Sequence, residues 1–405
     1  MRLPKNLPFP MHVALARVGF RHDKILSRAR ILGAMHSVTP NAAAAKAWAR
    51  GWWPESGRAH LQRAYDLPPL TVGPDVAPSS DDALHRDLIR LRNASARPGG
   101  EWKVEGDILF CPDRHTLFIG DRPFGPNTAR PSDIDFRKFR SRAQVEAAGQ
   151  VRKAKTAVLF DTLWLAYWHH FADALAPIAW INEIGIDPAA PLVVSAERKR
   201  LMQKLGLWKA AVQLAGGRKF ITIKPQQVLA TESAWVARMP EFHLPALDAA
   251  ARAAPREDGV DTPRRIFFAR SEGLRNQRGL LGEAEIAETF RRAGYFVVDP
   301  ALLSVGAQRT LLSKATHIAG AHGSSFTTLL FTENPVRIGG FMSSAYRSTT
   351  FSALSAAAGH SFVTTVGAAE EGGAKAAFRP KPDAADRLLG WLESDAAPSE
   401  FATGR

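Results

Sequence analysis

A strand-to-helix turn in the C-terminal half of the chain has the residue types that bind an anionic group. In THIAGAHGSSFTTLLF, a short apolar run ends at Gly320 and a polar helix start follows at Ser324. The first N–H groups of a helix lack partners within the helix and carry partial positive charge, so such a turn can bind phosphate. The residues of this candidate phosphate site are Gly320, His322, Gly323, Ser324, Ser325 and Thr327.

The same turn could also be an ordinary capped helix start, with Ser324 as the N-cap. The histidine favours ligand binding, because His322 is neither a good turn former nor a good apolar core residue. The segment has neither the GKS or GKT of a P-loop nor the GxSxG of a hydrolase nucleophile. We therefore interpret it as a phosphate site of another class.

A second group of candidate residues lies in YWHHFADALAP, where His169 and Asp173 are four residues apart. On a helix, this spacing places both side chains on one face. An imidazole beside a carboxylate can act as a general base, and either residue could take the proton of an attacking hydroxyl. The alternative is an aromatic core helix with a structural histidine. As metal ligands these residues supply only two positions, and no HExxH motif or carboxylate cluster completes a site.

Arginines form the third group of candidates. Arg270 is expected at the carboxyl end of the strand IFFAR, and Arg275 and Arg278 follow it. A guanidinium at this place could neutralise the charge that develops on a leaving diphosphate, a role that a divalent metal can also play. A solvated basic loop is the alternative, and it applies more to Arg275 than to Arg270.

Strands and helices alternate along the part of the chain that must position these residues, which indicates parallel sheets covered by helices. A pair of strands around a Pro-Asp turn is expected at 107–120. Further strands are predicted at 156–161, 191–195, 219–223, 228–237, 264–270, 295–299, 316–320, 336–341 and 361–366. Helices are predicted at 162–185, 197–205, 283–292, 304–314, 324–331, 348–358 and 383–394.

The segment 240–262 is rich in proline, alanine and charged residues, so we place the domain boundary there. Open parallel sheets bind ligands at the carboxyl ends of their strands, so two such domains would hold a two-substrate site between them. The predicted units are an N-terminal extension of mixed helix and loop at 1–95, an α/β domain at 96–245, a Rossmann-like domain at 262–368 and a terminal helix at 382–395.

Composition narrows the class of protein. A length of 405 residues predicts two domains, since a domain has roughly 150 residues. A single cysteine, Cys111, excludes an intrachain disulfide and fits a reducing compartment. No apolar run is long enough to span a membrane, so we expect a cytoplasmic protein. The net charge of +14 favours polyanionic partners, among them an anionic membrane surface, but the chain lacks a nucleic-acid-binding motif.

Taken together and in order, the three groups of residues resemble glycosyltransferase family 61. AYWHHFADALAP resembles the early family motif, which places the family histidine on His169 and the acidic position on Asp173. RIFFARSEGLRNQRGLLGE resembles the second motif, and LSVGAQRTLLSKATHIAGAHGSSFTTLLF resembles the third. The resemblance assigns family positions in these two motifs to Arg270, Arg278, Glu283, Gln308, His322, Gly323 and Phe331.

This resemblance implies a GT-B-like fold, in which two Rossmann-like domains face each other across a cleft. It also implies inverting transfer of a sugar without a bound metal or other cofactor, with a UDP-sugar as the commonest donor. We expect the acceptor to be a glycan or lipid-linked saccharide. The sequence departs from the family pattern at Ala166, Gly282 and Thr328, and VRIGGF lacks the expected acidic residue. These departures leave a second hypothesis open, a catalytically silent nucleotide- or carbohydrate-binding protein of the same fold.

Overall fold

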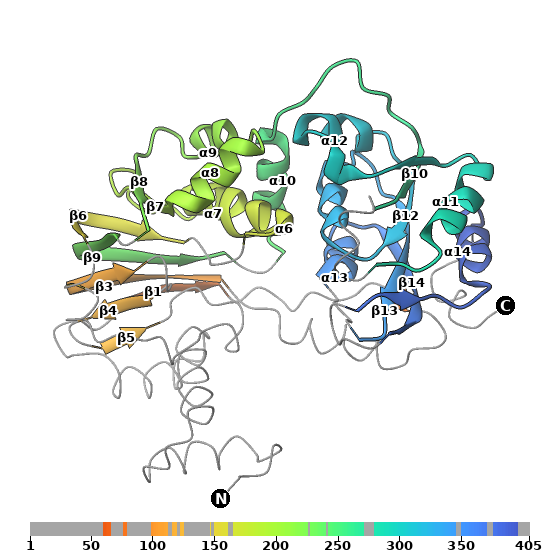
Figure 1. Ribbon diagram of the computed structural model, residues 1–405. Helices are drawn as coiled ribbons and strands as arrows, with labels where there is room; N and C mark the ends of the chain where they lie inside the picture. Colours follow the sequence, from red (N-terminus) through yellow and green to blue (C-terminus); the bar gives the residue numbers. More distant parts are fainter. Residues whose placement is uncertain are drawn as a thin grey trace, which may run out of the picture.

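Two β-sheets organise the chain (Figure 1). The computed structural model describes residues 60–65, 76–78, 99–111, 116–119, 122–124, 146, 150–160, 165–225, 227–239, 242–270, 279–345, 350–370 and 376–395. Both sheets contain parallel strands connected through helices, so the predicted α/β class is confirmed. The predicted domain limits stay a prediction.

The first sheet combines antiparallel and parallel strands. Within the described residues its order is β5, β4, β3, β9, β6, β7, β8, with β1 paired to β3. Strands β9, β6, β7 and β8 run parallel, whereas the pairs that involve β1, β3, β4 and β5 are antiparallel. These strands are β1 (His60–Tyr65), β3 (Gly99–Cys111), β4 (Thr116–Ile119), β5 (Arg122–Phe124), β6 (Gln150–Leu159), β7 (Leu192–Ser195), β8 (Phe220–Ile223) and β9 (Gln227–Arg238). The two strands predicted at 107–120 are confirmed as the end of β3 and β4.

Helices lie over one face of this sheet (Figure 1). They are α6 (Tyr167–His170), η5 (Phe171–Leu175), α7 (Ala176–Glu183), α8 (Ala196–Lys204), α9 (Trp208–Leu214) and α10 (Leu244–Ala253). The first three elements follow one another without a break and end before Gly185, whose φ of 74° cannot continue a helix. They confirm the helix predicted to end near Gly185, but η5 is a π-helical turn that the sequence pattern did not predict.

Helix α10 lies inside the segment that composition indicated as a linker. Pro245 is in its first turn, where a missing backbone N–H costs no intrahelical hydrogen bond. The side chain of His243 caps the helix by accepting a hydrogen bond from the N–H of Ala246 at 3.4 Å. The segment 240–262, where we placed the domain boundary, therefore contains a helix, and the chain leaves this helix at Ala254.

The second sheet is parallel at its centre. Within the described residues its order is β11, β10, β12, β13, β14, β15, and β2 also pairs with β14. Only the pair of β14 and β15 is antiparallel among these pairs. The strands are β10 (Arg265–Phe268), β11 (Phe296–Val298), β12 (His317–Ala321), β13 (Arg337–Ser343), β14 (Ser361–Ala369), β15 (Phe378–Arg379) and β2 (Val76–Pro78).

Helices cover both faces of the second sheet. They are α11 (Glu283–Arg292), η7 (Pro300–Leu302), α12 (Val305–Leu312), η8 (Ser324–Phe331), α13 (Thr350–Ala357) and α14 (Ala384–Leu392). Helices α11 and α14 pack together on one face, and α12, η8 and α13 lie on the other. Every helix in the described part of the chain falls short of the length and apolarity that a membrane span requires.

The strand order of this sheet reverses direction between β10 and β12. The chain runs from β10 to β11 by way of α11, and then returns past β10 to β12 by way of α12. Connections therefore leave β10 and β12 toward opposite faces of the sheet. Such a topological switch point, at the carboxyl ends of its two strands, is where open α/β sheets bind ligands.

The two halves share one hydrophobic cluster. It contains Phe171 and Trp180 of the first half together with Phe268 and Phe331 of the second. Helices α6 and α10 pack against η8, and the rings of Phe171 and Phe331 meet edge to face at 5.5 Å. Residues from the first and third sequence motifs are thus in direct contact, although 160 positions separate the two rings in the chain.

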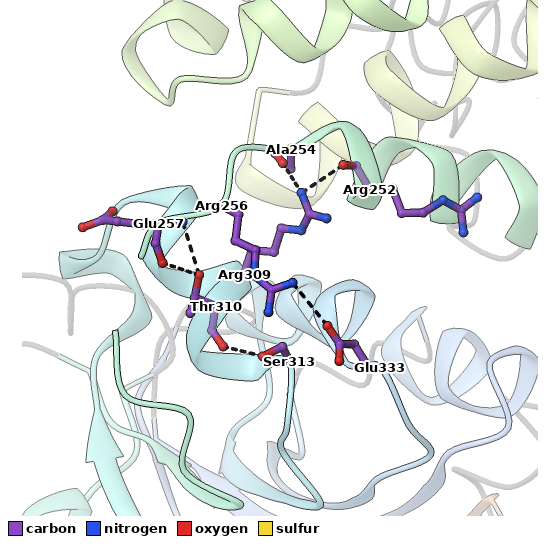
Figure 2. A network of polar contacts seen from close by, with 8 residues as sticks. All are labelled: Arg252, Ala254, Arg256, Glu257, Arg309, Thr310, Ser313 and Glu333. Atoms are coloured by element: carbon purple, nitrogen blue, oxygen red, sulfur yellow. Dashed lines mark hydrogen bonds and ion pairs between the residues drawn. The ribbon is translucent and has the colours of Figure 1, made fainter. Parts of the chain in front are cut away.

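The connection between the halves is bound to α12 (Figure 2). Arg309 donates hydrogen bonds through Nη1 to the carbonyls of Arg252, at 2.9 Å, and Ala254. The hydroxyl of Thr310 donates to the carbonyl of Glu257 at 2.7 Å and accepts from its N–H at 3.2 Å. A guanidinium of the second half therefore caps the carboxyl end of α10.

Candidate functional site

Strand β12 lies at the switch point and leads directly into the predicted phosphate site. Gly320 is in register with Phe268 on one side and Gly340 on the other. A Cβ atom at position 320 would lie 2.8 Å from both Cβ and the carbonyl oxygen of Phe268, so only glycine lets β10 approach this closely. This glycine therefore allows the close approach of a neighbouring strand.

The helix that follows the turn is a 3₁₀ helix, η8, and not the α-helix that an anion-binding terminus usually has. Gly323 is its N-cap residue in extended conformation, and the N–H of Phe326 donates to the carbonyl of Gly323 at 3.0 Å. Thr328 Oγ1 donates to the carbonyl of Ser325 at 2.7 Å. The side chain of Ser324 is exposed and that of Ser325 half-buried, so these two hydroxyls are accessible from solvent.

Arg270 follows β10 and lies across the switch point, as predicted from its place in the sequence. Its Nη2 atom donates to the carbonyl of His322 at 3.0 Å and is 3.4 Å from that of Ala321. A Cβ atom at position 323 would collide with Nη2, so Gly323 gives the guanidinium its place against the turn. A fixed positive charge thus lies beside the first residues of η8.

The imidazole of His322 lies in an aromatic environment. Its ring packs against the rings of Phe326, Phe351 and Phe362, with centroids 6.1, 5.5 and 6.5 Å away. Its exposed fraction is only 5%, whereas the main chain of His322 binds Arg270. The accessible part of the turn is therefore formed by Arg270, Ser324 and Ser325 more than by the imidazole.

The remaining candidates of the second half have different placements. Thr327 is fully buried within η8, away from solvent. Glu283 is buried at the first position of α11. Gln308 donates to the carbonyl of Pro300 at 2.8 Å and thereby fastens the loop before α12. Arg275 and Arg278 lie outside the described residues.

The predicted pair of His169 and Asp173 is formed. Nδ1 of His169 lies 2.6 Å from Oδ2 of Asp173, and both side chains are about a quarter exposed. When Nδ1 carries the proton it donates to the carboxylate, and Nε2 is then left as a basic nitrogen. The pair lies where α6 passes into the π turn η5, a type of turn that is frequent at functional sites.

Aromatic side chains connect this pair to the candidate phosphate site. Trp168, next to His169, meets Phe351 of α13 edge to face at 5.6 Å, and the same Phe351 packs against His322. Trp168 also contacts Phe242 at 6.4 Å. We did not predict a role for Phe351, because an apolar residue in an apolar helix gives no sequence signal. Burial raises the pKa of Tyr167, which therefore stays neutral at the start of α6.

One departure from the family pattern has a local explanation, and α14 packs closely against β13. Gly282 has a left-handed φ of 74°, a conformation that asparagine tolerates better than other non-glycine residues, so glycine can replace asparagine here. In β13, a Cβ atom at Gly339 would lie 2.7 Å from Cγ of Leu388. The C-terminal helix α14 therefore occupies space that a larger side chain at this position would need. Among the described residues, no three histidine, cysteine or carboxylate side chains group as a metal site.

The fold and the site together define an α/β protein with a guanidinium at the carboxyl ends of two strands of one sheet and a histidine–carboxylate pair at the end of α6, which packs against η8 of the same half as that sheet. The family model Glycosyltransferase 61 matches residues 167–339, from the first residue of α6 into β13. This confirms the resemblance to glycosyltransferase family 61 that the three motifs predicted, and the family implies glycosyltransferase activity. A comparison with curated proteins gave no match.

Proposed function

We propose that the protein is an inverting glycosyltransferase that transfers a sugar from a UDP-linked donor to a glycan or lipid-linked polysaccharide precursor. In this proposal the two halves act as the two domains of a GT-B enzyme, with the donor on the second sheet and the acceptor on the side of α6. One observation carries the proposal, the guanidinium of Arg270 against the Gly323 turn at a topological switch point.

Donor binding would use the positive charge at this edge of the sheet. A diphosphate beside Arg270 would meet the N–H groups at the start of η8 and the hydroxyls of Ser324 and Ser325. Charge develops on the leaving diphosphate as the glycosidic bond to it breaks. A guanidinium that is already in place stabilises this charge without reorganisation, which is why we expect transfer to be independent of a metal.

The first half would supply the base. The acceptor oxygen attacks the anomeric carbon from the face opposite the diphosphate, and its proton passes to Nε2 of His169. The bond from the anomeric carbon to the diphosphate oxygen breaks, and the nucleoside diphosphate leaves with the bonding electrons. Asp173 orients the imidazole and stabilises its protonated form, as the 2.6 Å contact allows.

The net charge of +14 supports action at the cytoplasmic face of an anionic membrane, where lipid-linked precursors are held. At the start of β6, the exposed residues Arg152, Lys153 and Lys155 add local positive charge. Nucleic acid is not part of the proposal, because charge is its only support.

Calorimetric titration with UDP and a panel of nucleotide-sugars tests the donor site. We expect Arg270→Met to weaken binding about 10- to 100-fold, since a charge-assisted hydrogen bond contributes about 1.5–3 kcal/mol. Arg291→Met is the matched control, because Arg291 pairs with Glu288 on the surface of α11. Equal affinities in both variants would remove the donor site from the switch point.

Donor hydrolysis without acceptor separates an enzyme from a silent binding protein. A transferase releases free sugar slowly and continues to do so in excess EDTA, whereas a silent protein binds the nucleotide and releases none. Activity that disappears in EDTA and returns with a divalent metal would overturn the metal-independent mechanism.

A further inference from the structure

Arg198 is a buried charge that touches the backbone of the candidate base. It lies in the first turn of α8, directly after β7, and its exposed fraction is 0%. Its Nη1 atom donates to the carbonyl oxygen of His169 at 2.9 Å. A fully buried guanidinium is costly unless polar groups surround it, so its position indicates a specific task.

His169 lies beside an irregular turn of its helix. The helix changes from α to π between His170 and Phe171, where the hydrogen-bond ladder lengthens by one residue. A donor from outside the helix can add a hydrogen bond to a carbonyl group beside such a junction. Arg198 supplies that donor from another helix, and so it anchors the backbone that carries the imidazole.

A second buried arginine of the same half shows what a purely structural role looks like. Arg218 donates to the carbonyls of Ile186, Asp187 and Ala190 and through Nε to Oδ1 of Asn182 at 2.7 Å. It therefore holds the loop between α7 and β7. Arg198 differs because its acceptor belongs to the residue whose ring pairs with Asp173.

We propose that Arg198 is a positioning residue, which holds the π turn so that Nδ1 of His169 meets Asp173 and Nε2 faces the acceptor side. The expected effect of Arg198 on turnover rests on the function proposed above. Its expected effect on the His169–Asp173 contact does not depend on any activity. A merely structural role would give Arg198 and Arg218 the same phenotype, loss of stability without loss of the histidine contact.

NMR of the full-length protein with ¹⁵N-labelled histidine tests the contact directly. The signal of the Nδ1–H bonded to Asp173 is assigned as the one lost in His169→Gln. We expect it to disappear in Arg198→Met, to return in Arg198→Lys, which keeps a charge and one donor, and to stay in Arg218→Met. An unchanged signal in Arg198→Met overturns the proposal, as does a loss of the signal in Arg218→Met.

Steady-state transfer assays, run below the unfolding temperature of each variant, then measure how loss of this contact changes turnover. Misplacement of a reacting group costs on the order of 10²-fold, so kcat of Arg198→Met should fall by that factor with an unchanged KM for the donor. Arg198→Lys should recover part of the loss. If the NMR signals behave as expected but the wild type transfers no sugar, the proposed function fails and the positioning role stands. A higher KM with unchanged kcat would contradict the role of Arg198.

Discussion

The two halves of the molecule use different means to place polar groups. In the second half, strand order alone creates the switch point, and Arg270 and the turn after β12 lie there because each follows one of the two strands. In the first half, helices lie over one face of a mixed sheet, and His169 and Asp173 meet through helical spacing. The comparison teaches that topology can place a guanidinium at the carboxyl ends of strands, whereas local periodicity brings a histidine and a carboxylate together.

We proposed that the first half supplies the base and the second half binds the donor. If this division of tasks is correct, substitutions in the first half should change turnover and leave donor binding intact. We expect His169→Gln to lower kcat about 10²- to 10⁴-fold, because a positioned base contributes a factor of this size. Asp173→Asn should lower kcat less, since the base itself remains. Steady-state transfer assays together with calorimetric donor binding measure both quantities.

The first half offers a matched control for this experiment. Nε2 of His243 lies 3.4 Å from Oε1 of Glu183, in a second histidine–carboxylate pair that lies outside the motif of α6. His243→Gln should leave kcat unchanged. Weakened nucleotide binding in His169→Gln would break the division of tasks between the halves.

The contact between the halves can be tested through Phe331. Phe331→Ala should reduce the free energy of unfolding by about 3–5 kcal/mol, the usual cost of removing a buried aromatic ring. Because the ring packs on Phe171, both halves should unfold in one shifted transition. Urea titrations followed by far-UV circular dichroism and by tryptophan fluorescence give the two profiles.

Phe296→Ala is the control for this substitution, since its ring is 42% exposed on the edge strand β11. It should change stability little. Two separate transitions in Phe331→Ala, one of them at the wild-type urea concentration, would show that the halves are stable independently.

Much of the fold was predictable because the strands of the second half are short apolar runs between clear helix signals. Ser304 and Gly185, for example, begin and end helices as their residue types predict. Helix α10 was missed because its proline resembles a breaker, although proline in a first turn breaks nothing. Periodicity cannot reveal a π turn either, because one extra residue leaves the apolar pattern nearly unchanged.

The candidate site was predictable where spacing decides geometry and less so where packing decides it. The separation of four residues gave the contact of His169 with Asp173 correctly. The burial of His322 among three phenylalanine rings was not foreseen, because those rings come from three separate elements. Arg198 carried no signal in the sequence, since its acceptor is a backbone carbonyl of another helix.

Acidic conditions should weaken the second half through His360. Burial lowers the pKa of His360 from 6.5 to about 4, and its Nδ1 accepts a hydrogen bond from the N–H of Val336 at 3.3 Å. Between pH 6.5 and 4 the unfolded chain binds a proton that the folded chain excludes, so stability falls as pH falls, by up to about 3 kcal/mol. Below pH 4 this contribution is constant.

Urea unfolding of the wild type and of His360→Asn between pH 7.5 and about 4 measures this effect. Asparagine keeps an acceptor for Val336 but does not titrate, so the variant should lose less stability on acidification. Burial also lowers the pKa of His317, which acts with the same sign in both proteins and cancels in the comparison. Parallel pH profiles for the two proteins would contradict the assignment to His360.

The smallest effect is expected where the connection between the halves is bound to α12. Arg309→Met removes the donor that caps α10, at a cost of about 1–2 kcal/mol for a partly exposed charged hydrogen bond. Arg252→Met is the control, because its side chain pairs with Asp248 on the surface and only its carbonyl receives Arg309. Hydrogen exchange should accelerate at the carboxyl end of α10 in Arg309→Met and not in the control. Equal exchange in both variants would mean that Arg309 does not stabilise the carboxyl end of α10, and apolar packing together with the Thr310–Glu257 hydrogen bonds would then account for the contact between the halves.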